Sequence, residues 1–164
     1  MARIDFVTGA PEKYSGLVDQ IEQARSSLRV VVVQETEANM RRHADSEDWS
    51  AKRTLAHLGV YLRLNSVLIR RIATMSDPER QPIDEEKAIE ESSFMTGSAM
   101  DLMQSIDKSV DETIELLSGT PDASWGRRGS VEGVSRSLRQ QVEGYSSHIL
   151  EHPEQKKMAP PQNQ

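Results

Sequence analysis

The chain of 164 residues contains no cysteine, which excludes disulfide bonds, thiolate metal ligands and a protein-borne sulfur nucleophile. Acidic residues outnumber basic residues by 26 to 20, so no cationic excess is available to follow a phosphate backbone. The longest unbroken apolar run, Val30–Val33, is far too short to span a membrane. Residues Met1–Gly9 hold no apolar stretch typical of a signal peptide. We therefore expect a cytoplasmic protein that binds neither nucleic acid nor a membrane.

Apolar residues recur at helical spacing in four segments that are bounded by capping or turn-forming residues. The first helix is predicted to begin at Pro11, a residue suited to a first helical turn, and the second at Ser50, a good N-cap. No segment shows the alternation typical of a strand, so the sequence predicts an all-α protein. The predicted helices are approximately Pro11–His43, Ser50–Met75, Ser98–Leu117 and Val131–His152.

The connection between the second and third helices, Pro78–Gly97, is long for a compact domain, and such connections often cover a site. Within it, Asp84–Ala88 could form a short helix whose acidic start is expected to face solvent. Four helices with one long crossover predict a four-helix bundle. We expect residues 1–153 to form this single domain and residues 154–164, rich in Lys, Pro and Gln, to be disordered.

Two of the four histidines, His148 and His152, lie four residues apart on the apolar stripe of the last predicted helix. A third, His57, lies near the start of the second. A helical i, i+4 pair directs both rings to one side, and a third imidazole from a facing helix would leave a metal position open for water or substrate. The alternative is a set of core histidines satisfied by backbone or neighbouring side chains, since a lone H-x-x-x-H spacing is a weak motif. His43, in a polar segment, is interpreted as a solvated cation.

Two tyrosines lie about one helical turn from these histidines, Tyr61 after His57 and Tyr145 before His148. Either could line a substrate site and donate its hydroxyl, or could be an amphipathic core residue. Glu151 is expected to point to another face of its helix. Neither a Gly-rich phosphate loop nor a serine-hydrolase motif occurs.

Three segments resemble the DinB/YfiT superfamily. Residues 48–59, DWSAKRTLAHLG, resemble the signature D-W-S-x-x-x-x-x-x-H-L at the start of the family's second helix. Ser137–Val142 resembles the lead-in to its last helix, and His148–His152 resembles its H-x-x-x-H, with Gln155 where the family often has glutamine.

This resemblance implies a DinB/YfiT-like four-helix bundle with a divalent metal, commonly nickel or zinc, held by His57, His148 and His152. Characterised relatives include S-transferases that use low-molecular-weight thiols such as bacillithiol or mycothiol. A metal would lower the pKa of a bound thiol and present a thiolate as nucleophile. The resemblance therefore implies a metal-dependent thiol S-transferase, or a related transferase or hydrolase, that acts on a small electrophile.

Pro153 departs from the family pattern, because proline disfavours helical geometry at the preceding residue. We expect a frayed or rotated last turn at His152. The alternative function is accordingly a non-catalytic structural or interaction module with a weak or absent metal site. A homodimer is also expected, because the second helix carries two apolar stripes and Val30–Val33 adds apolar surface beyond the need of one core.

Overall fold

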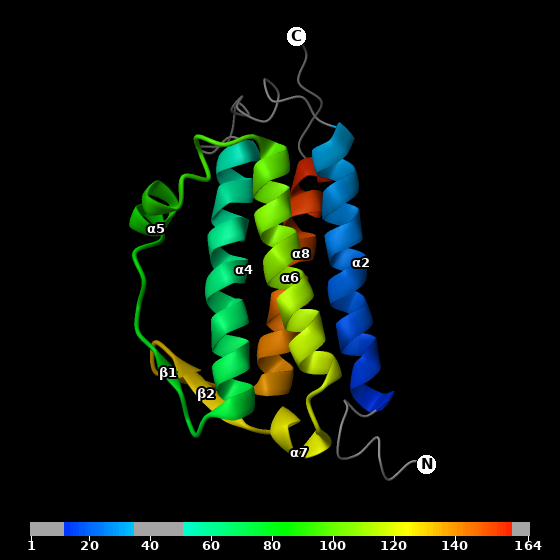
Figure 1. Cartoon of the computed structure of the whole chain (residues 1–164), viewed down its shortest axis with the longest axis vertical. Coiled ribbons are helices and arrows are strands. Elements are labelled where there is room, and N and C mark those ends of the chain that lie inside the picture. The colour runs from blue at the N-terminus through cyan, green and yellow to red at the C-terminus, as the bar shows by residue number, and fades with distance from the viewer. Residues whose placement is uncertain (1–11, 35–50, 159–164) are drawn as a thin grey trace.

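The computed structural model describes residues 12–34 and 51–158, with side chains described as far as Glu151. Four long helices run side by side, with α2 and α8 pointing one way and α4 and α6 the other (Figure 1). Both α2 and α4 pack against α6 and against α8, so α2 and α4 lie diagonally opposite across the core. The predicted four-helix bundle is confirmed. Its helices are α2 (Glu12–Gln34), α4 (Ala51–Thr74), α6 (Ala99–Ser118) and α8 (Leu138–Met158).

Helical periodicity explains these elements. On α6, buried residues follow one another at three- and four-residue steps, including Leu102, Ile106 and Val110, and Ser98 and Asp101 form a reciprocal capping box at its start. The second predicted helix agrees with α4 and the third with α6, to within one residue at each end. Residues 35–50 are outside the described part of the chain, and so are the predictions made for His43 and for the cap at Ser50.

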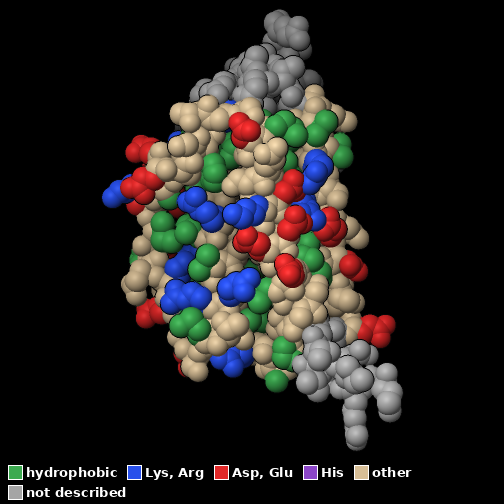
Figure 2. Space-filling model, in the orientation of Figure 1, with side chains coloured by type: hydrophobic (Ala, Val, Ile, Leu, Met, Phe, Trp, Pro, Cys, Tyr) green, Lys and Arg blue, Asp and Glu red, His purple; other side chains and the backbone are tan. Residues whose placement is uncertain are grey.

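Charged side chains join α2 to α6 on the face shown in Figure 2. Arg25 forms ion pairs with Glu22 of its own helix and with Asp111 of α6. Next to it, Arg29 Nη2 lies 2.5 Å from Asp107 Oδ1. Arg25 is buried, whereas its partners Glu22 and Asp111 are exposed to solvent. Solvent at the carboxylates weakens such pairs, so the bundle is held mainly by its apolar core.

Because α4 and α6 run in the same direction, the chain must return along the bundle between them (Figure 1). This crossover contains β1 (Glu79–Arg80) and α5 (Glu85–Ser92), whose N-cap Asp84 accepts a hydrogen bond from the Lys87 backbone N–H. After α6 come α7 (Asp122–Trp125), β2 (Arg128–Val131) and β3 (Val134–Ser137). The strands form a sheet in the order β1-β2-β3, with β1 parallel and β3 antiparallel to β2.

The hairpin of β2 and β3 corrects one prediction. Val131–Ser137 was predicted to begin the last helix, but α8 begins at Leu138. Glu132 and Gly133 have φ values of 51° and 82°, the two positive values that a type I′ hairpin turn requires. Ser137 and Gln140 then form a reciprocal capping box: Gln140 N–H donates to Ser137 Oγ, and Ser137 N–H donates to Gln140 Oε1.

The prediction of a frayed last turn at His152 is wrong for the backbone, because α8 continues through Pro153 to Met158. Proline lacks the N–H that would bond to the Ile149 carbonyl, so one helical hydrogen bond is absent while the helical path persists. The described helix therefore includes residues 154–158, which were expected to be disordered. Residues 159–164 are outside the described part of the chain.

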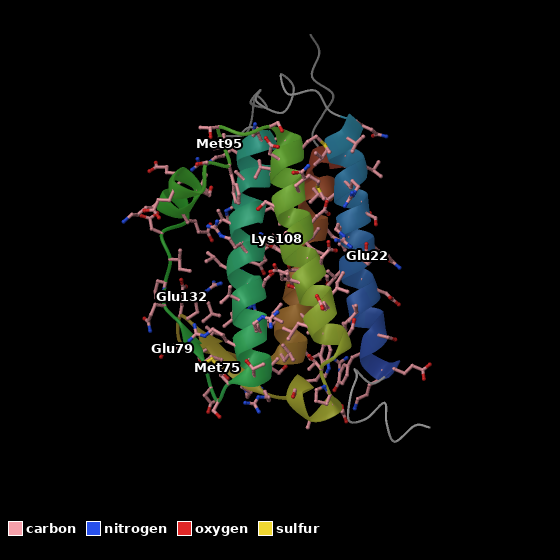
Figure 3. The ribbon with its side chains drawn as sticks, in the orientation of Figure 1. Glu22, Met75, Glu79, Met95, Lys108 and Glu132 are labelled. Carbon is pink, nitrogen blue, oxygen red and sulfur yellow. The ribbon has the colours of Figure 1, made fainter. Side chains whose placement is uncertain are left out.

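The small sheet is fixed to the end of α4, where Figure 3 shows Met75, Glu79 and Glu132. Gly129 of β2 lies so close that a Cβ there would be 2.7 Å from Ile72 Cγ1 and 3.1 Å from the Pro78 carbonyl oxygen. That same oxygen accepts a hydrogen bond of 2.9 Å from the Ser130 N–H. Glycine at position 129 thus allows the strand to approach the helix.

Gly129→Ala is expected to lower the free energy of unfolding by about 1–3 kcal/mol, because its methyl group would overlap Ile72 and the Pro78 carbonyl. The matched control is Gly126→Ala, where an added Cβ meets no atom within 4 Å and φ is −88°. Urea unfolding followed by circular dichroism measures both variants. Equal midpoints for the two variants would show that the close approach is not needed.

Candidate metal centre

Polar side chains face one another along the contact between α4 and α8. His57, Tyr61 and Asn65 follow at four-residue steps on α4, which places them on one face of the helix. On α8, Gln141 and His148 are seven residues, two turns, apart on the facing side. We call these five residues the α4–α8 seam.

The seam brings two of the three predicted metal ligands together. The ring centroids of His57 and His148 are 5.8 Å apart, with an interplanar angle of 52°. The Tyr61 ring stacks on the His148 ring at 3.8 Å and 22°. The His57 side chain is 15% exposed and the His148 side chain 24%, so both rings are largely buried while an approach from solvent is retained.

A carboxylate accompanies the Nδ1 atom of each histidine. Glu85 Oε2 lies 2.9 Å from His57 Nδ1, and Glu151 Oε2 lies 3.6 Å from His148 Nδ1. A carboxylate at Nδ1 favours a proton on that nitrogen and leaves the Nε2 lone pair for a ligand, as in carboxylate–histidine–metal sites. The acidic segment beginning at Asp84 faces solvent as expected, but Glu85 also reaches His57. Glu151, which was expected to point elsewhere, approaches His148.

Burial lowers the pKa of His148 below the ordinary histidine value, and the nearby His57 acts in the same direction. The carboxylates of Glu151 and Glu85 oppose this shift. The ring is consequently neutral at pH 7, which is the form of imidazole that binds a metal.

The third predicted ligand, His152, lies one turn beyond His148 on α8, and its side chain is outside the described part of the structure. Among the side chains that are described, no three of His, Asp or Glu come close enough to form a metal-binding group. The described donors are thus two imidazoles on facing helices, each with a carboxylate near its Nδ1 atom. Neutral nitrogen donors of this kind fit zinc or nickel.

The two predicted substrate-binding tyrosines differ in their surroundings. Tyr145 is fully buried, and its hydroxyl lies 2.9 Å from Ser66 Oγ and accepts from Thr113 Oγ1 at 3.5 Å, so it belongs to the core. Tyr61 lies on the seam. Burial raises the pKa of Tyr61, and the positive charges of Arg80 and Arg136 oppose that shift.

A model of the DinB superfamily matches residues 20–155, which is most of the chain. The chain belongs to the DinB superfamily. The family resemblance drawn from residues 48–59 and from the last helix is thereby confirmed. No curated protein shows significant similarity to the chain.

Two solved structures share the fold of this superfamily member. One is described as "YfiT from Bacillus subtilis is a probable metal-dependent hydrolase with an unusual four-helix bundle topology"; it is 16% identical, with a TM-score of 0.77 over 90% of this chain and 88% of that one. The other, a mycothiol-dependent maleylpyruvate isomerase, is 14% identical, with a TM-score of 0.72 over 85% of this chain. The match spans only 58% of the isomerase's length.

Within the described ranges, no helix is both long and apolar enough to cross a membrane. The expectation drawn from the short apolar run Val30–Val33 agrees with this finding.

The lowered pKa of His148 makes the stability of metal-free protein depend on pH. The folded state holds this proton less tightly than the unfolded chain does. The contribution of neutral His148 to the free energy of unfolding is therefore complete above the ordinary histidine pKa of about 6.5. It is lost as the pH falls through the lower pKa of His148 in the folded protein. We expect EDTA-treated protein to lose stability in urea as the pH falls below about 6.5. His148→Gln should flatten this dependence, while the other three histidines remain in both proteins. An imidazole signal of His148 that titrates above the ordinary value would contradict the assignment.

Proposed function

We propose that this protein is a metal-dependent enzyme that transfers a low-molecular-weight thiol onto a small electrophile. The observation that carries the proposal is the placement of His57 and His148 on facing helices, 5.8 Å between ring centroids, with a carboxylate beside each Nδ1. In this proposal His57, His148 and His152 hold zinc or nickel. The metal-dependent and mycothiol-dependent descriptions of the two structural neighbours support it.

A bound metal would supply a Lewis acid that lowers the pKa of a coordinated thiol or water. The protein's own groups do the positioning. Glu85 lies beside Nδ1 of His57 as an ion-pair partner, and Glu151 lies farther from Nδ1 of His148, so both place negative charge next to the imidazoles. Tyr61 packs against His148, and because burial raises its pKa, its hydroxyl stays protonated and can donate a hydrogen bond to substrate.

The identity of the nucleophile, thiol or water, decides between two related enzymatic functions of this site. The chain has no cysteine of its own, so a sulfur nucleophile must come from a cosubstrate. If water takes the place of the thiol, the same site would support hydrolysis, as the description of YfiT suggests for that protein. The non-catalytic module remains the alternative, in which the seam histidines serve only to join α4 to α8.

Metal binding is the first test. Protein purified without an affinity tag and stripped with EDTA should bind stoichiometric zinc or nickel in a calorimetric titration, and its melting temperature should rise with metal concentration. His57→Ala and His148→Ala should abolish the rise, because each removes a ligand. Glu85→Gln should weaken affinity by about 10–100-fold, whereas Glu91→Gln, exposed on the same helix α5, should not.

The metal-loaded, metal-free and variant proteins are then used in an assay of the proposed reaction. Because the protein has no cysteine, a thiol reagent such as DTNB measures only the added thiol. Metal-loaded protein should accelerate consumption of a small thiol by a soluble aryl halide, and EDTA-stripped protein and His57→Ala should not. Absence of metal binding at neutral pH would leave the non-catalytic module as the function. Metal binding with release of acid from an ester, but no thiol consumption, would favour the hydrolase.

We also propose a homodimer. The second apolar stripe of α4 is used inside the bundle at Leu68, which is buried, whereas α2 exposes two neighbouring valines, Val30 at 55% and Val33 at 61%. Val33→Glu should then produce a monomer, while Val67→Glu, a substitution of an exposed valine on α4, should not. Light scattering measures the mass, and a wild-type mass of 18.4 kDa at high micromolar concentration would refute the dimer.

A further inference from the structure

Two buried amides bridge the seam two turns away from the histidines. Asn65 is 2% exposed and Gln141 3%. Asn65 Nδ2 donates to the Tyr61 backbone carbonyl at 2.8 Å, and Gln141 Nε2 donates to Asn65 Oδ1 at 2.9 Å. From β1, Arg80 Nη1 donates to the same oxygen at 3.2 Å. An amide and a guanidinium group therefore converge on one carbonyl oxygen.

This network fixes the orientation of both amides. A backbone carbonyl can only accept, so Asn65 must turn its NH₂ group to Tyr61 and present Oδ1 to the seam. Since Oδ1 can also only accept, Gln141 must present its own NH₂ group to it. Gln141 Oε1 then points away from Asn65 as an acceptor, and it is buried without a hydrogen-bond partner in the described ranges.

Arg80 shows the complementary feature. Its Nε atom, a donor, is buried and likewise has no hydrogen-bond partner among the residues that the structure describes. Leaving such a buried group without a hydrogen bond is unfavourable. The cluster thus offers one donor, Arg80 Nε, and one acceptor, Gln141 Oε1, on groups that both contact Asn65 Oδ1.

Open space adjoins α8 between this cluster and the histidines. Gly144 lies on α8 between Gln141 and His148, and a Cβ built there would meet no atom within 4 Å. Two helical turns separate Gln141 from His148, which is about 10 Å along the axis. A small linear molecule could extend over this distance, with one end at the histidines and the other at the amides.

We propose that Arg80, Asn65 and Gln141 form a subsite that binds a secondary amide of the substrate or cosubstrate. The amide C=O would accept from Arg80 Nε and its N–H would donate to Gln141 Oε1. A carboxylate satisfies only the first group and is repelled by the second, and an alkyl chain satisfies neither. The subsite itself stands on the hydrogen-bond network, whereas its link to chemistry at His57 and His148 rests on the proposed function.

The test compares two linear thiols, pantetheine and N-acetylcysteamine, which is the same thiol end truncated before the second amide. On zinc-loaded protein, pantetheine should bind at least about 10-fold more tightly, the equivalent of about 1.4 kcal/mol. In ¹⁵N NMR spectra, the Arg80 Nε–H and Gln141 side-chain signals should shift with pantetheine only. Gln141→Leu and Arg80→Lys should equalise the two affinities and leave zinc binding unchanged.

Gly144→Leu separates loss of binding from loss of folding. Leucine would occupy the open space beside α8 between Gln141 and His148 and remove the preference for pantetheine. Replacing a glycine inside a helix also favours the helix, so the variant is expected to fold. The matched control is Gly16→Leu on α2, where an added Cβ also meets no atom within 4 Å. This control should bind both thiols as wild type does.

Separate outcomes overturn the subsite and the proposed function. Equal affinities in the wild type, or a preference that survives in Gln141→Leu, would refute the subsite, as would a trapped water that holds Gln141 Oε1 and Arg80 Nε throughout the titration. If the protein binds no zinc, the proposed function fails. Shifts of Arg80 and Gln141 on addition of pantetheine to the metal-free protein then still decide whether the amide subsite exists.

Discussion

The parallel direction of α4 and α6 is the constraint on which the candidate site depends. Two parallel neighbours cannot be joined by a short turn, so the chain has to travel back along the bundle before α6 begins. On this path it places Arg80 against one part of α4 and Glu85 against another. One connection thus delivers a cation to the buried amides and a carboxylate to His57, about two helical turns apart on α4.

The bundle was predictable because long periodic stripes dominate this sequence. The hairpin was missed for a local reason. Its strands are four residues long, and its turn is Glu-Gly rather than the Asn-Gly or Asp-Gly that normally marks a type I′ turn. A usable signal was present in the spacing of Ser137 and Gln140, since Ser-x-x-Gln is a capping box that places the start of α8 correctly.

For the site, periodicity identified the residues that helices carry and missed those that the crossover carries. His57, Tyr61 and His148 follow from spacing on α4 and α8. Glu85 belongs to an acidic run that predicts a solvent-exposed segment. Only the folded course of the crossover places it beside His57. Gln141 was visible as a polar residue on an otherwise apolar stripe, but the amide that satisfies it lies 76 residues away in the sequence.

The polar character of the seam also bears on how the bundle moves. In the core that α4 shares with α6, Leu102, Ile106 and Val110 are buried, and the polar contact between these helices involves the hydroxyl groups of Ser66 and Thr113. Where α4 meets α8, imidazoles and amides replace part of that apolar contact, and their hydrogen bonds can exchange with water at little net cost. Separation of α8 from α4 is therefore expected to be the easiest local opening of the fold. The stretch of α8 that would hold a ligand is then also the stretch whose packing against α4 is most easily lost when none is bound.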